Sequence, residues 1–161
     1  MRALIERFDL RPLPIEGTLF AETYRSSTST AIVGLYAADP PSRSCFHVLA
    51  HDEIWHAYAG DPFRLVLLHP GGASEEVVMG RDAGAGQRVQ VTVPAGTWQA
   101  GELLPGGRYA LFGCTMAPGF TPECFRASPA GPLVAGWPGR AADIERLAIA
   151  EASERTFGTP K

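Results

Sequence analysis

Lysine is the residue that the sequence most plainly lacks: the only one is Lys161, the last residue. Enzymes that form a Schiff base with a carbonyl substrate or with pyridoxal phosphate do so through a lysine amine. The sequence therefore excludes an internal Schiff-base lysine, and with it lysine-linked pyridoxal phosphate chemistry and lysine-based aldolases.

Cysteine is scarce as well. The three cysteines, Cys45, Cys114 and Cys124, are odd in number, and none belongs to a C-x-x-C pair. This pattern predicts neither a disulfide framework nor a zinc ribbon. Cys114 lies in an apolar segment, which favours a buried thiol over a reactive one.

Long apolar runs are missing too. No run approaches the roughly 18 residues that a membrane-spanning helix needs. The first ten residues, MRALIERFDL, carry acids where a secretory signal would have an apolar core. We therefore expect a cytoplasmic protein with no membrane partner.

Basic charge is limited and scattered. The chain has 14 basic and 17 acidic residues, a formal net charge of −3, and no basic block. Proteins that bind nucleic acid usually gather arginine and lysine on one face. We therefore expect no nucleic-acid partner.

Turn residues, in contrast, are abundant: the sequence has 18 glycines and 14 prolines, spread without a repeat. They separate short apolar segments at a spacing of roughly 8–12 residues, which is typical of an all-β sandwich or barrel. The predicted strands span residues 18–25, 31–38, 44–50, 53–59, 63–69, 75–79, 88–93, 97–103 and 108–116. We expect segments 44–50 and 53–59 to pair with one another through the connection at His51 and Asp52.

The length favours a single domain over residues 1–161. We place the barrel at about residues 16–126, and a Pro/Gly-rich connection at 127–140. One helix is predicted at about 141–157, where Ile144 and Leu147 recur at helical spacing between charged residues.

Two polar stretches carry the candidate chemistry: residues 46–60, FHVLAHDEIWHAYAG, and residues 93–100, VPAGTWQA. We expect them to face each other inside the barrel and to line one pocket. Residues two apart in a strand share a face. If His47 and Glu53 both point inward, an imidazole and a carboxylate meet in an apolar cavity, which suits acid–base work or ligand binding. The alternative is that the two form a structural pair in the core.

Other candidate residues surround this pair. Trp55 shares a face with Glu53, so it is a candidate lining residue, whereas Trp98 has the opposite parity to Gln99 and is expected to pack. The amide of Gln99 can donate hydrogen bonds to a polar ligand and accept them. Arg25 ends the first predicted strand, where it either clamps a carboxylate or phosphate or is an exposed strand-end charge.

The spacing of the first stretch resembles the first motif of the cupin superfamily, H-x-H-x(3,4)-E-x(6)-G. His47 falls on the first histidine of that motif, Glu53 on the glutamate and Gly60 on the glycine. Leu49 stands where the second histidine belongs.

The second stretch resembles the second cupin motif, P-x-G-x-x-H. Pro94 and Gly96 match, and Gln99 replaces the histidine. The sequence around both motifs is similar to that of a small-cupin family of largely unknown function, and it includes EGTLFAETYRSS at 16–27 and GCTMAPGF at 113–120. That family resembles the dTDP-sugar epimerases in fold, and the resemblance runs from about residue 4 to residue 148.

The resemblance implies an all-β double-stranded β-helix, a jelly-roll barrel with a short C-terminal helix, and a homodimer. It also implies a metal cage of three histidines and one carboxylate, of which only His47 and Glu53 remain. Leucine cannot bind a metal, and an amide is a poor ligand for a transition metal. We therefore predict no cofactor. A divalent metal, held by His47, Glu53 and Gln99, is the alternative.

The function expected from these residues is small-molecule binding. If the protein is an enzyme, we expect metal-independent isomerisation or epimerisation of a sugar or another small polar metabolite, with His47 as the base and Glu53 as the acid or orienting group. Two alternatives stay open: a binding or sensing module without turnover, and a metal-dependent oxygenase or isomerase.

Overall fold

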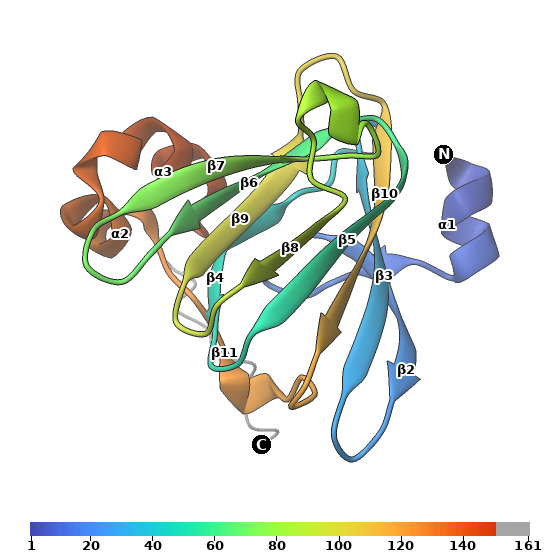
Figure 1. The fold of residues 1–161 in the computed structure, drawn as a ribbon, viewed down its shortest axis with the longest axis horizontal. Coiled ribbons are helices and arrows are strands. Elements are labelled where there is room, and N and C mark those ends of the chain that lie inside the picture. The colour runs from blue at the N-terminus through green and yellow to red at the C-terminus, as the bar shows by residue number, and fades with distance from the viewer. Residues whose placement is uncertain (151–161) are drawn as a thin grey trace.

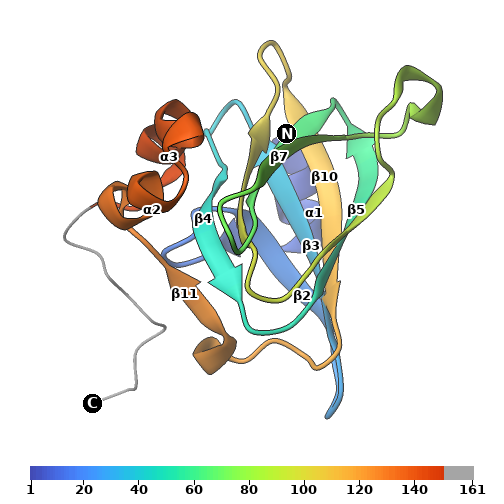
Figure 2. The same cartoon turned by 60° about the vertical axis from the view of Figure 1, so that its left-hand side comes forward.

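Two antiparallel sheets pack face to face in the computed structural model, which describes residues 1–150 (Figures 1 and 2). The six-stranded sheet has the order β1 (Arg11–Pro12), β2 (Leu19–Arg25), β3 (Thr30–Ala37), β10 (Tyr109–Met116), β5 (Glu53–Gly60) and β8 (Gln90–Val93). The five-stranded sheet has the order β11 (Phe125–Ala127), β4 (Ser44–Leu49), β9 (Trp98–Leu103), β6 (Phe63–Leu68) and β7 (Ser74–Met79). This is the double-stranded β-helix that the sequence predicted.

The nine predicted strands are confirmed, because each predicted segment overlaps one of the strands β2 to β10. Side-chain alternation explains the success. In β5, Glu53 and Trp55 are buried while the intervening Ile54 and the next residue, His56, are only half-buried. The strands β1 and β11 were not predicted, since two or three residues beside prolines carry no visible alternation.

The predicted pairing of segments 44–50 and 53–59 is wrong. β4 pairs with β9 and β11, whereas β5 pairs with β10 and β8. The connection at His51 and Asp52 therefore crosses from one sheet to the other, and Asp52 closes it by accepting a 2.8 Å hydrogen bond from the amide of Ala95. This crossing sets the inner faces of β4 and β5 opposite one another.

The predicted C-terminal helix is shorter than expected. α3 (Ala141–Leu147) ends at Leu147, Ala148 is extended, and Ile149 forms a parallel bridge with Pro129. Two turns suffice because they already bury Ile144 and Leu147 completely. The part of the predicted helix at 151–157 lies outside the described residues.

Several short elements complete the chain. The segment 127–140, predicted as an irregular connection, contains α2 (Ala130–Gly136) and the 3₁₀ turn η3 (Pro138–Arg140). The others are α1 (Arg2–Phe8), η1 (Ala83–Ala85) and η2 (Pro122–Cys124). Among residues 1–150, no helix has the length and apolar character needed to cross a membrane.

Apolar side chains fill the space between the sheets and cover their outer faces. The central cluster contains Tyr36, Trp55, Phe63 and Phe112, whose rings contact one another at centroid distances of 4.5–6.4 Å. α2 and α3 pack outside the five-stranded sheet, and α1 packs outside the six-stranded sheet (Figures 1 and 2).

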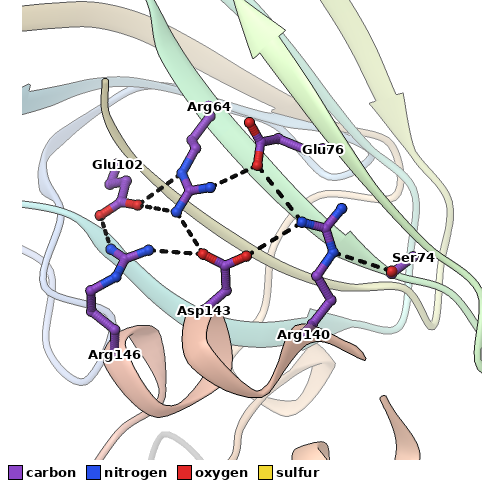
Figure 3. Close-up of polar contacts among 7 residues, drawn as sticks. All are labelled: Arg64, Ser74, Glu76, Glu102, Arg140, Asp143 and Arg146. Atoms are coloured by element: carbon purple, nitrogen blue, oxygen red, sulfur yellow. Dashed lines mark hydrogen bonds and ion pairs between the residues drawn. The ribbon is translucent and has the colours of Figure 1, made fainter. Parts of the chain in front are cut away.

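A network of ion pairs joins α3 and η3 to the outer face of β6, β7 and β9 (Figure 3). At its centre the guanidinium of Arg64 donates to Glu102 at 2.8 Å, to Glu76 at 2.7 Å and to Asp143 at 2.6 Å. Arg140 and Arg146 flank Asp143, and Arg146 also bonds Glu102. Three carboxylates are thus compensated by three guanidinium groups.

Candidate functional site

A cavity of about 70 Å³ lies between the two sheets, where the inner faces of β4 and β5 meet β2, β3 and β10. Its ionisable lining residues are Glu16, Glu22, His47, Glu53 and Cys114. The rest of the wall is mostly apolar and includes three phenylalanine rings, those of Phe20, Phe120 and Phe125. His47 and Glu53 therefore do meet at one cavity, whereas the prediction that residues 93–100 line it as well is wrong, because none of them is in its wall.

His47 is held rigidly on β4. The residue is 2% exposed, and its ring stacks on Phe125 at a centroid distance of 5.3 Å and an interplanar angle of 17°. Nδ1 lies 2.8 Å from the carbonyl oxygen of Cys45. Because a carbonyl can only accept, Nδ1 carries the proton in the neutral ring, and Nε2 is left with its lone pair.

Glu53 begins β5 and is 8% exposed. Its Oε2 accepts a 2.7 Å hydrogen bond from Nε2 of Gln99, while Oε1 of Gln99 accepts a 2.8 Å bond from the indole N–H of Trp55. An indole nitrogen can only donate, so Trp55 fixes which end of the Gln99 amide faces Glu53. Both ends of that amide are therefore committed within the protein.

Burial raises the pKa of the Glu53 carboxyl. The nearby charge of Glu16 also raises this pKa, while His47 and the hydrogen bonds from Gln99 and Cys114 lower it. Glu53 thus keeps a proton to higher pH than an exposed glutamate does, which suits a general acid.

The cavity thiol is inert. Cys114, on β10, is 4% exposed, and burial raises its pKa well above the ordinary value, with the charges of Glu53 and Glu16 adding to the effect. A thiol held in this protonated form is a weak nucleophile.

The three predicted ligand-binding residues lie around the cavity rather than in it. Gln99 orients Glu53 by donating a hydrogen bond to its carboxyl. Trp55 packs in the aromatic core, with its ring centroid 4.9 Å from that of Phe112. Arg25 is half-exposed at the end of β2, where it donates to both carboxylate oxygens of Glu22 and to the carbonyl of Phe120. It therefore braces two lining residues, and neither it nor Trp55 nor Gln99 lines the cavity.

Glu16 is a cavity residue that the sequence did not reveal. Its Oε2 lies 4.0 Å from Nε2 of His47, and its Oε1 accepts a 2.7 Å hydrogen bond from the hydroxyl of Thr18. It sits in the irregular segment before β2, with no periodic pattern around it. The only signal that could have drawn attention to Glu16 is its position in segment 16–27, whose sequence is similar to the small-cupin family.

The side chains present do not fit the four-ligand metal cage that the cupin resemblance implies. Leu49 lines the cavity at one ligand position, and the oxygen of Gln99 is occupied by Trp55. None of the other three histidines replaces them: His56 bonds Thr115, His69 bonds Glu75, and His51 lies in the connection after β4. Over residues 1–150, no group of three or more His, Cys, Asp or Glu side chains is arranged to hold a metal ion.

Comparison with known proteins gives one family match and many structural matches. A family model described as Cupin superfamily (DUF985) matches residues 2–128. A hypothetical protein from Leishmania major is 26% identical, with a TM-score of 0.85, over 92% of this chain and 98% of that one. A protein from Shewanella oneidensis is 29% identical, with a TM-score of 0.82, over 92% of this chain and 96% of that one.

More distant matches show the fold alone. Oxalate decarboxylase from Bacillus subtilis is 15% identical, with a TM-score of 0.53, and the match covers 86% of this chain but 37% of that one. No curated protein matches the sequence.

Proposed function

The chain belongs to the Cupin superfamily family DUF985, and from this premise we propose that it binds a small molecule between His47 and Glu53 and moves a proton on it. The observation that carries the proposal is the shared cavity: the lone-pair nitrogen of His47 and the carboxyl of Glu53 both line it. The two groups come from opposite sheets, so they can approach a bound molecule from two sides.

The chemistry that suits this pair is isomerisation or epimerisation. Nε2 of His47 removes a proton from a carbon next to a carbonyl, and the protonated carboxyl of Glu53 hydrogen-bonds the carbonyl oxygen and donates to it. The protonated His47 then returns a proton to carbon while Glu53 takes its proton back from the enol oxygen, so both groups are restored and no oxidant or reductant is consumed. The burial of both groups favours this exchange because it excludes competing water.

The size of the cavity limits the substrate. Sites for drug-sized ligands are roughly 300–1,000 Å³, and this cavity measures about 70 Å³. The reacting centre therefore belongs to a small polar metabolite, or to one end of a larger molecule such as a sugar that enters from the mouth.

The second candidate is a binding or sensing module without turnover. It is favoured by the hydrogen bond that holds Oε2 of Glu53 on Gln99, which restrains the carboxyl that would have to transfer a proton. The metal-dependent alternative has no comparable support, because the donor set is incomplete. A homodimer and a cytoplasmic location stay predictions.

Proton exchange with solvent separates the two candidates. The wild-type protein is incubated in D₂O with pools of small metabolites, and binding is detected by ligand-observed NMR while deuterium incorporation at carbon is followed in the same spectra. We expect at least one bound compound to exchange a carbon-bound proton, and a His47→Gln variant to bind it but exchange it roughly 100-fold more slowly or less. Binding without exchange would leave the binding module as the function, and no binding at all would sink both candidates.

A further inference from the structure

The charges around the cavity identify the class of ligand that it accepts. Three of its lining residues are glutamates, Glu16, Glu22 and Glu53, and none is an arginine or lysine. Arg25, which contacts the lining residues Glu22 and Phe120, already donates from Nε and Nη2 to Glu22 and from Nη1 to the carbonyl of Phe120. An entering carboxylate or phosphate would therefore lose its hydration and meet no arginine or lysine in the cavity wall, which is unfavourable.

One buried group in the cavity lacks a partner. His47 is only 2% exposed, yet within the described part of the chain its Nε2 has no hydrogen-bond partner, and Glu16 lies 4.0 Å away. Every fully enclosed side-chain nitrogen or oxygen among residues 1–150 is hydrogen-bonded, so Nε2 must face the cavity space. An unpaired acceptor in so buried a side chain indicates a donor that the protein itself does not supply.

The separation of these two acceptors fits a single donor atom. Nε2 of His47 and Oε2 of Glu16 are too far apart, at 4.0 Å, to bond each other. They are close enough for one nitrogen, about 2.8–2.9 Å from each, to donate to both. An ammonium group has N–H bonds enough for both acceptors, and Glu53 lines the same cavity.

The rest of the wall suits the same group. Phenylalanine residues from three segments, Phe20, Phe120 and Phe125, line the cavity. Aromatic faces attract cations through the ring quadrupole, whereas they repel anions. A cavity of about 70 Å³ accepts an ammonium with a few attached carbons.

We propose that the ligand of this cavity carries a protonated primary amine, which donates to Nε2 of His47 and Oε2 of Glu16. This inference rests on the proposed function, because it concerns the same cavity, and it narrows the substrate to a small amine or to the amine end of a larger molecule.

Three probes of nearly equal size test the ligand class: ethylammonium, ethanol and acetate, each titrated at constant ionic strength. The readout is the indole N–H resonance of Trp55, because its hydrogen bond leads through Gln99 to Glu53. A charge-assisted hydrogen bond contributes ~1.5–3 kcal/mol, so we expect ethylammonium to bind at least ~10-fold more tightly than ethanol, with no saturable shift from acetate. Equal or tighter binding of ethanol or acetate would overturn the inference, and this comparison needs no variant.

A charge-removing variant locates the binding. Glu16→Gln should weaken ethylammonium binding ~10-fold or more and leave ethanol binding within ~2-fold. Glu6→Gln, which removes an exposed carboxylate on α1, is the matched control and should leave both unchanged. Equal loss in the two variants would refute the assigned site.

The outcomes also separate this inference from the proposed function. If the metabolite pools yield a bound compound that is anionic or uncharged, and ethylammonium does not bind, the amine class is wrong while the pocket stands. If neither the pools nor any of the three probes binds, both proposals fall.

Discussion

Burial of Glu53 has opposite effects on stability and on chemistry: it makes the ionised carboxyl unfavourable in the fold, and it keeps the carboxyl protonated for proton transfer. Burial raises its pKa above the ordinary value of 4.5, so the folded protein holds this proton more tightly than the unfolded chain does. The group therefore contributes most to stability below pH 4.5, and this contribution is lost as the pH rises towards the folded-state pKa. This loss of stability at higher pH is the consequence of keeping a buried proton donor in the site.

Substituting Glu53 by glutamine tests that cost. A glutamine side chain at this position keeps an acceptor for Gln99 but never has to bury a charge. We expect the free energy of unfolding of Glu53→Gln, relative to wild type, to increase between pH 4 and pH 8. Urea unfolding at both pH values measures it. The exposed control Glu6→Gln should show a smaller pH-dependent difference, and a difference for Glu53→Gln that falls with pH would contradict the raised pKa.

Single residues also show why the place of His47 and Glu53 in the site could be predicted from the sequence, whereas that of Glu16 could not. His47 and Glu53 belong to one motif, so their meeting at a cavity could be anticipated as one of two possibilities, although alternation did not decide between them, since every residue of β4 is buried. Glu16 reaches His47 only through the path of the chain before β2, and that path follows no local period. Trp55 obeyed its predicted parity, yet an inward side chain in a barrel can meet the packed core as readily as the cavity.

At the scale of elements, turn residues and alternation located the strands, but they did not say which strands pair. The two-residue spacing at His51 and Asp52 looks like a hairpin, whereas the structure uses it to change sheets. The C-terminal helices depend on similar nonlocal information. α2 contains Pro132 and two glycines, and packing against the five-stranded sheet overrides that low propensity.

The ion-pair network in Figure 3 is the polar part of that packing. Arg64 is 17% exposed and compensates Glu76, Glu102 and Asp143 from the centre. Replacing it leaves three carboxylates close together with only Arg140 and Arg146 to compensate them. Breaking a fully buried pair costs ~3–5 kcal/mol, and partial exposure reduces this figure, so we expect Arg64→Met to lose about 1–3 kcal/mol.

Urea unfolding with and without 1 M sodium chloride checks the electrostatic origin of that loss. Salt screens the repulsion among the remaining carboxylates, so the gap between Arg64→Met and wild type should narrow. The matched control is Arg11→Met, which removes a pair with Asp9 whose side chains are 75% and 79% exposed, and it should cost less than ~0.5 kcal/mol. Equal losses in the two variants would mean that the network does not hold α3.

At the scale of the whole molecule, the double-stranded β-helix brings together positions that are far apart in the chain. Residues 47 and 49 on β4, 53 on β5 and 99 on β9 come from two sheets. The cupin motifs identified these four positions from sequence, and the family match confirms the scaffold. What the motifs cannot specify is the hydrogen bonding that a replaced residue adopts, such as the link from Trp55 through Gln99 to Glu53.

Restoring the two missing histidines tests whether the scaffold still holds a metal cage. Leu49 lines the cavity, and Gln99 already contacts Glu53, so histidines at 49 and 99 would join Nε2 of His47 and that carboxylate. Three imidazoles and one carboxylate suit Zn²⁺ or Ni²⁺. We expect L49H/Q99H, stripped with chelator, to bind Zn²⁺ at least ~100-fold more tightly than wild type in calorimetric titrations. In the control L49H/W98H, the second histidine lies on the opposite face of β9, because neighbouring residues of a strand alternate, and no such gain should follow. Tight stoichiometric binding of Zn²⁺ by the wild-type protein would show that its own side chains already form a metal site. That result would contradict both the metal-free chemistry proposed above and the hydrogen-bonding role given to Gln99.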